Sequence, residues 1–101
     1  AGAEAHATVL AALRLLGLGS RGVCLVEADG QGRMRADRLR AALAGDRAPT
    51  LICAQAGNVN TGAFDPLAEI ADLAAEHAAW LHVDGAFGLW AAASPARREQ
   101  V

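Results

Sequence analysis

The sequence contains no lysine, because all nine of its basic side chains are arginines. These 101 residues therefore offer no lysine amine that could form a covalent bond with a ligand. Aromatic residues make up only 4% of the chain and the formal net charge is −2. Because a nucleic-acid-binding surface needs a basic face, commonly with interleaved aromatic side chains, we expect no nucleic-acid partner.

Cysteines and long apolar runs are also scarce. The two cysteines, Cys24 and Cys53, are far from a C-x-x-C spacing and have no histidines at metal-ligand offsets. We expect both to be small core residues, which fits a reducing, cytoplasmic setting. Charged residues interrupt every apolar run well before the ~20 residues of a bilayer span, and the first residues do not resemble an export leader. We therefore expect a cytoplasmic protein without membrane contact.

What is present indicates a packed globular chain, since 53% of the residues are hydrophobic and only 20% are charged. Its length fits a single domain. Apolar residues at helical spacing predict three helices, at residues 5–16, 37–45 and 66–78. Short apolar runs bounded by turn residues predict three strands, at residues 23–27, 50–54 and 80–83.

Strands that alternate with helices predict a mostly parallel sheet with helices on both faces, a three-layer α/β fold. Asp37 and Asp65 are expected to cap the second and third helices, with Pro66 at the first helical position. Ligands of such sheets bind beyond the carboxyl ends of the strands. This rule groups the loop 55–62 with residues 84–88.

Asp84 is the most informative residue of that group. The stretch WLHVDGAFGL, residues 80–89, is an apolar strand that ends in one acid and continues with small residues. A carboxylate there could merely cap the following helix. The alternative is that Asp84 keeps a cationic heterocycle protonated, while small residues such as Ala86 let the flat ring approach the backbone. His82 and Asp84 are too few for a metal site, and we expect no metal.

Other polar residues gain meaning only from their positions. Asn58 and Asn60 follow the second predicted strand, where they could satisfy a turn or donate to a ligand oxygen. His6 lies near the start of the first helix, where a lone histidine is usually a surface residue.

Three motifs in order give the chain a resemblance to a known family: AEAH at residues 3–6, GNVNTGAFDP at residues 57–66 and WLHVDGAFG at residues 80–88. Together they resemble the pyridoxal-phosphate-dependent group II amino-acid decarboxylases over nearly the whole chain. The resemblance implies part of the large domain of a fold type I enzyme. It also implies a homodimeric parent protein that converts an L-amino acid to an amine and carbon dioxide.

Carried over by position, the resemblance assigns roles to five residues. His6 would stack on the cofactor ring, Asp84 would pair with the pyridine nitrogen, and Ala86 would pack against the opposite ring face. Asn58 or Asn60 would lie near the phenolic oxygen of the ring. His6 and Asp84 would be the catalytic residues of this segment.

The resemblance also implies that residues 1–101 are a partial domain. The lysine that holds the cofactor in this family follows the aspartate by some thirty residues, and the phosphate-binding segment precedes the His6 helix, so both would lie outside the chain. The isolated chain is then expected to be inactive. Two alternatives stay open: a cysteine desulfurase or class V aminotransferase of the same fold, and a non-catalytic interaction module with a degenerate pocket.

Overall fold

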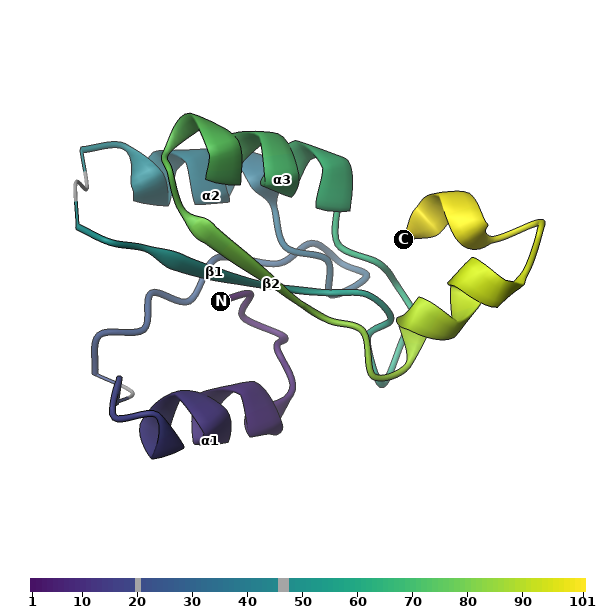
Figure 1. Cartoon of the computed structure of the whole chain (residues 1–101), viewed down its shortest axis with the longest axis horizontal. Helices are drawn as coiled ribbons and strands as arrows, with labels where there is room; N and C mark the ends of the chain where they lie inside the picture. Colours follow the sequence, from purple (N-terminus) through teal and green to yellow (C-terminus); the bar gives the residue numbers. More distant parts are fainter. Residues whose placement is uncertain (20, 46–47) are drawn as a thin grey trace.

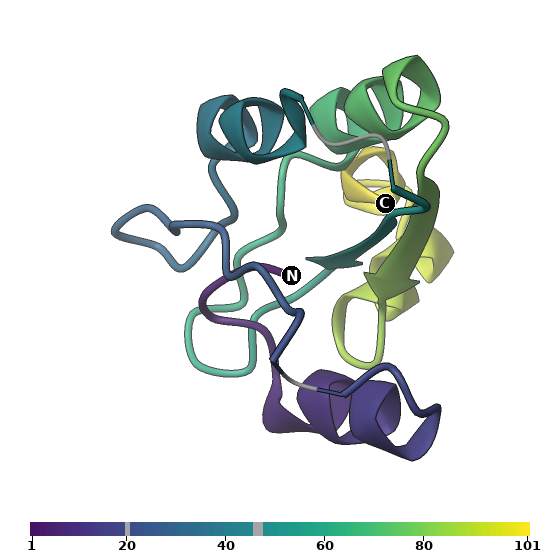
Figure 2. The ribbon, with the colours of Figure 1, turned by 90° about the vertical axis from the view of Figure 1, so that its left-hand side faces the viewer.

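The structure is a computed structural model that describes residues 1–19, 21–45 and 48–101. Its regular elements, in chain order, are α1 (Ala7–Leu15), α2 (Ala36–Leu43), β1 (Leu51–Gln55), α3 (Leu67–Glu76), β2 (Trp80–Asp84) and the 3-10 helices η1 (Gly88–Ala93) and η2 (Arg98–Gln100). Helices α2 and α3 cover one face of the two strands, and α1 lies on the opposite side (Figures 1 and 2). The three-layer α/β arrangement predicted from the sequence is confirmed.

Strands β1 and β2 pair in parallel, and Gln55 stands opposite Asp84 in the register. The Trp80 amide donates to the Thr50 carbonyl at 2.9 Å, and the Ala56 amide donates to the Asp84 carbonyl at 2.8 Å. Because peptide groups alternate in direction along a strand, the backbone N–H and C=O groups of the even-numbered residues of β1 point toward β2. The backbone N–H and C=O groups of the odd-numbered residues point toward the other edge of β1, where the described residues form no further strand.

The core lies between β1 and the two helices above it. Ile70 and Leu73 of α3 are fully buried, and they pack with Leu39 of α2 and with Ile52 and Ala54 of β1. These positions follow the helical and strand periodicities expected from the sequence. Strand β2 differs from this pattern, because most of its side chains are exposed in the described chain.

The strand expected at residues 23–27 does not form. Val26 pairs in parallel with Gly2, and Ala28 pairs in antiparallel fashion with Met34, but each is an isolated bridge. The segment meets no partner long enough to build a ladder, so of residues 23–27 only Val26 pairs, at a single point. Cys24 is consequently exposed, which corrects the expectation that both cysteines are core residues; Cys53 is buried as expected.

Both predicted aspartate caps are also wrong. Helix α2 has Arg35 at its N-cap, and Asp37 lies inside the first turn, where its carboxylate pairs with Arg35 at 2.7 Å. Helix α3 begins at Leu67 with Pro66 at its N-cap. The Asp65 side chain accepts two hydrogen bonds from backbone amides of other segments, so it is not available to cap α3.

Candidate functional site

The predicted cofactor site centres on Asp84, the last residue of β2. Its side chain is half-buried, and Oδ1 accepts a hydrogen bond from the Ala86 amide at 3.1 Å. In the described parts of the chain no group donates a hydrogen bond to Oδ2. Asp84 therefore does not cap η1, whose N-cap is Phe87. One carboxylate oxygen of Asp84 is held by the following turn, and the other is available to a ligand.

The loop after β1 and the turn after Asp84 touch through their backbones. The Gly88 amide donates to the Ala56 carbonyl at 2.9 Å. A Cβ on Gly57 would lie 2.7 Å from the Gly88 nitrogen, and Gly57 also has a φ of +88°, which only glycine adopts easily. A Cβ on Gly88 would collide with the Ala56 carbonyl. The two loops grouped from the sequence are thus joined at the carboxyl end of the sheet.

The two candidate asparagines of this loop differ in their environment. Asn58 is buried, and its Oδ1 accepts hydrogen bonds from the amides of Asn60 at 2.9 Å and Thr61 at 3.2 Å. Asn60 is exposed, and its backbone amide serves this turn. The turn-forming role considered from the sequence therefore applies to Asn58, and of the two side chains only that of Asn60 is left outside the turn.

His6 is the N-cap of α1. Its Nδ1 lies 2.8 Å from the Thr8 hydroxyl and accepts from the Thr8 amide at 3.4 Å. Figure 1 shows α1 beginning beneath the end of the sheet where β2 finishes. Figure 2 also shows α1 on the side of the strands opposite α2 and α3. No hydrogen bond joins His6 to Asp84 in the described chain. The exposed imidazole is therefore fixed by its helix and not by the other candidate residues.

Sequence reasoning missed the part that Asp65 plays beside this site. Its buried carboxylate accepts from the Met34 amide and from the Gln55 amide, each at 2.7 Å. Burial, which is the largest influence, raises the pKa of Asp65, while the two amide hydrogen bonds oppose that rise. An aspartate directly before a proline at a helix start looks like a cap, and only the fold shows which amides it meets.

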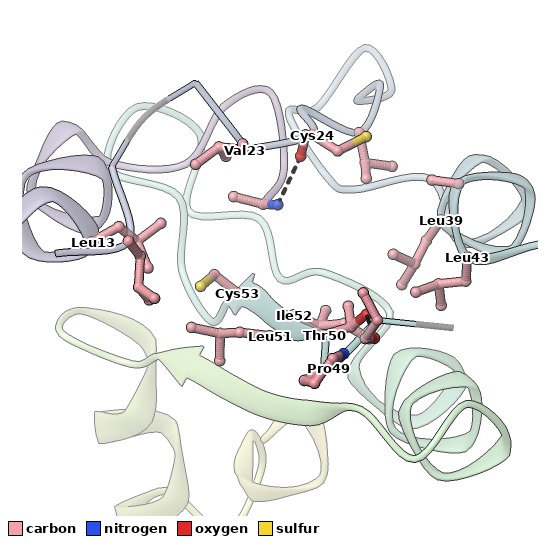
Figure 3. Close-up of a pocket in the computed structure, with 16 residues that line it drawn as sticks. Leu13, Val23, Cys24, Leu39, Leu43, Pro49, Thr50, Leu51, Ile52 and Cys53 are labelled. Atoms are coloured by element: carbon pink, nitrogen blue, oxygen red, sulfur yellow. Dashed lines mark hydrogen bonds between the residues drawn. The ribbon is translucent and has the colours of Figure 1, made fainter. Parts of the chain in front are cut away.

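A cavity of about 380 Å³ lies elsewhere, at the amino-terminal half of β1 (Figure 3). Apolar side chains from three layers line it, among them Leu13 of α1, Leu43 of α2 and Ile52 of β1, together with the segment around Val23 and Cys24. None of the five predicted site residues lines this cavity. The candidate site is instead an open surface at the opposite, carboxyl end of the strands.

The donor set of the candidate site suits a flat, cationic ring with an oxygen substituent. The Asp84 carboxylate can pair with a protonated ring nitrogen, the small Ala86 leaves space beside it, and asparagine amides can donate to an oxygen. In the described chain no group of three or more His, Cys, Asp or Glu side chains is placed to hold a metal ion. No described helix is long and apolar enough to cross a membrane.

Comparisons with known proteins identify the family of the chain. Residues 1–100 match the pyridoxal-dependent decarboxylase conserved domain. The chain is 44% identical over 90 residues to human acidic amino acid decarboxylase GADL1, covering 85% of the chain and 17% of that protein. It is 43% identical over 90 residues to L-2,4-diaminobutyrate decarboxylase of Rhizobium meliloti, covering 85% of the chain and 18% of that protein. The chain thus spans less than a fifth of these relatives.

Solved structures show the same likeness in three dimensions. Mouse CSAD in its apo form superposes with a TM-score of 0.90 at 36% identity, covering 99% of this chain and 22% of that one. Oryza sativa TDC with PLP and tryptamine gives a TM-score of 0.89 at 30% identity, covering 98% of this chain and 21% of that one. From its domain match and its relatives, the chain belongs to the pyridoxal-dependent decarboxylase family.

Proposed function

We propose that the whole protein is a pyridoxal-phosphate-dependent carboxy-lyase that converts an L-amino acid to its amine and carbon dioxide. Residues 1–101 supply part of its cofactor-binding large domain. The observation that carries the proposal is the carboxylate of Asp84 at the carboxyl end of β2, with one oxygen held by the Ala86 amide and the other available to a ligand. Because the chain belongs to the pyridoxal-dependent decarboxylase family, the ligand of the second Asp84 oxygen would be the pyridine ring of pyridoxal phosphate.

Pyridoxal phosphate, when bound, supplies a pyridine ring that accepts the electron pair left on the substrate α-carbon as carbon dioxide departs. Asp84 holds a proton on the ring nitrogen, because its charge stabilises the protonated form. Ala86 and His6 would hold the ring, Ala86 against one face and His6 against the other. The side-chain amide of Asn58 or Asn60 would donate an N–H to the phenolic oxygen.

The relatives support decarboxylation over the same-fold alternatives. The two curated relatives described above are named as decarboxylases, one of acidic amino acids and one of 2,4-diaminobutyrate. A cysteine desulfurase or class V aminotransferase would also use an aspartate at this position, so Asp84 alone does not separate these reactions. The homodimeric state of the parent is proposed from the family resemblance, and its cytoplasmic location from the two free cysteines, Cys24 and Cys53.

The test uses the full-length protein with a panel of acidic, diamino and aromatic L-amino acids. We expect an absorbance band of bound cofactor, together with equimolar carbon dioxide and amine from at least one substrate. Formation of alanine from cysteine, added to the panel with a thiol that reduces the enzyme-bound persulfide, would favour a desulfurase instead, and formation of a keto acid without carbon dioxide would favour an aminotransferase. A full-length protein that binds no cofactor would indicate the non-catalytic module.

A further inference from the structure

Three segments that are distant in sequence meet at the carboxylate of Asp65. Oδ1 accepts from the Met34 amide, just before α2, and Oδ2 accepts from the Gln55 amide at the end of β1. The Asp65 amide donates in return to the Gln55 carbonyl at 3.0 Å. In the described chain no arginine or histidine forms an ion pair with Asp65, so its partners are peptide groups alone.

This carboxylate closes the loop that carries the candidate asparagines. Ala56 and Phe64 form an antiparallel bridge inside the Gln55–Asp65 pair, and the Asn58 amide donates to the Ala63 carbonyl at 2.7 Å. The loop is therefore a small hairpin whose open end is fastened by Asp65. Asn58 lies three residues from the fastened end, on the strand of the hairpin that Gln55 begins.

The bond from Met34 brings a second loop against the first. The Thr61 hydroxyl donates to the Gln31 carbonyl at 2.8 Å. A Cβ on Gly32 would lie 3.1 Å from Nδ2 of Asn58. The loop 29–34 thus forms a wall beside Asn58, and Asp65 fixes both the wall and the hairpin.

The same carboxylate is connected to the ring-binding side of the site. Gln55, which Asp65 holds, stands opposite Asp84 in the parallel register. The next residue, Ala56, donates to the Asp84 carbonyl and accepts from the Gly88 amide. Fixing the end of β1 therefore fixes the hairpin relative to the turn that orients the Asp84 side chain.

We propose that Asp65 is a positioning residue for the cofactor site, which sets the asparagine hairpin against Asp84 by accepting one backbone amide on each carboxylate oxygen. The inference rests on the proposed function. Asparagine has a single side-chain acceptor, so Asp65→Asn retains one of the two amide bonds and turns an N–H donor toward the other amide. The volume of the side chain is nearly unchanged.

The experiment compares Asp65→Asn with Leu39→Ala in the full-length protein loaded with pyridoxal phosphate. Leu39 is buried in the core cluster, and none of the hydrogen bonds that fasten the hairpin involves it, so its truncation is a control for stability loss alone. Cofactor binding is measured at a temperature at which both variants are folded. We expect Asp65→Asn to weaken this binding by about tenfold. We also expect it to change the circular dichroism of the bound cofactor, whereas Leu39→Ala leaves both unchanged.

A second pair of variants keeps the inference testable if Asp65→Asn does not fold. Gly32→Ala and Gly17→Ala both place a side chain at positive φ, +78° at Gly32 and +81° at Gly17, but only the Cβ at position 32 meets Asn58. We expect weaker cofactor binding for Gly32→Ala than for Gly17→Ala. Equal binding within each pair, with wild-type binding intact, would overturn the inference alone, whereas a wild-type protein that binds no cofactor would overturn the proposed function as well.

Discussion

Among single residues, Asp84 carries the proposed chemistry. Replacing it by asparagine preserves the size of the side chain and can preserve the bond from the Ala86 amide, but it removes the charge that keeps the ring nitrogen protonated. We expect Asp84→Asn in the full-length protein to lower kcat/KM by about 100-fold while retaining some cofactor. Steady-state kinetics and cofactor absorbance measure the two effects. Asp72→Asn, an exposed change on α3, is the control, and unchanged turnover in Asp84→Asn would exclude the proposed role.

The tight packing of Gly88 predicts a loss of stability when this single residue is replaced. Its position allows no Cβ, because that atom would meet the Ala56 carbonyl and lie 2.8 Å from the Gly57 nitrogen. We expect Gly88→Ala to lower the free energy of unfolding by about 1–3 kcal/mol, measured by urea denaturation. Gly30→Ala has no atom within 4 Å of its new Cβ and serves as the matched control. Equal stability of the two variants would contradict this packing.

Single residues also mark the limit of sequence reasoning. The position of Asp84 at the end of a strand follows from an apolar run that stops at one acid, and the structure confirms that position. The role of Asp65 could not be predicted, because the Met34 amide that it binds is 31 residues away in sequence and reaches it only in the folded chain. The burial of Asn58 has the same origin, since the loop 29–34 covers it.

Among the elements, α3 contributes most to the core. Ile70 has no exposed surface, and it packs in one core cluster with Leu39 of α2 and Ile52 of β1. We expect Ile70→Ala to lower the free energy of unfolding by about 2–5 kcal/mol, because it leaves a cavity that α3 cannot close. Leu15→Ala at the exposed end of α1 should change stability by less than about 0.5 kcal/mol. Chemical denaturation of both variants checks the contrast, which comparable losses would contradict.

The tie between segments at Asp65 gives stability a pH dependence. Because burial raises the pKa of Asp65 above its usual 3.8, the folded protein keeps this proton to higher pH than the unfolded chain. The stability contribution is therefore fully present below pH 3.8 and is lost as pH rises through the folded pKa. Protonation leaves a lone pair on each oxygen for the two amides.

The comparison of wild type with Asp65→Asn isolates this effect. The lowered pKa values of Asp29 and Asp37, caused mainly by hydrogen bonds from backbone amides and from Arg35, are common to both proteins and cancel. We expect the stability advantage of the wild type to shrink as pH rises from 3.8, in unfolding curves measured at several pH values. An advantage that grows with pH would show that the two amide bonds outweigh burial.

Most helices and strands could be predicted from apolar spacing, within two or three residues at their ends. The exception at residues 23–27 is instructive, because β-branched residues become a strand only beside a partner of sufficient length. Only Val26 finds a parallel partner, at Gly2, and Leu25 is 56% exposed. The composition of residues 23–27 favours a strand, but no neighbouring strand of the described chain is long enough to pair with them, so they form only an isolated bridge.

For the whole molecule, exposed apolar surface is the dominant property. Leu15, Trp80 and Trp90 are 90%, 74% and 80% exposed, and one edge of β1 lacks a neighbouring strand in the described chain. We expect the 101-residue chain to self-associate with rising concentration, since apolar patches and open strand edges both promote association. Light scattering measures this, and Trp90→Ser should reduce it whereas Arg98→Gln should not. A monomer at all concentrations would contradict the expectation.

The backbone contact between the loop after β1 and the turn after β2 also has a practical consequence for protein engineering. Because Gly57 and Gly88 meet without room for a Cβ, these two positions cannot be randomised in a library that aims to alter substrate choice. The neighbouring Val59 and Phe87 are exposed and carry no such restriction. Diversity introduced there would vary the rim of the site while the scaffold beneath it stays fixed.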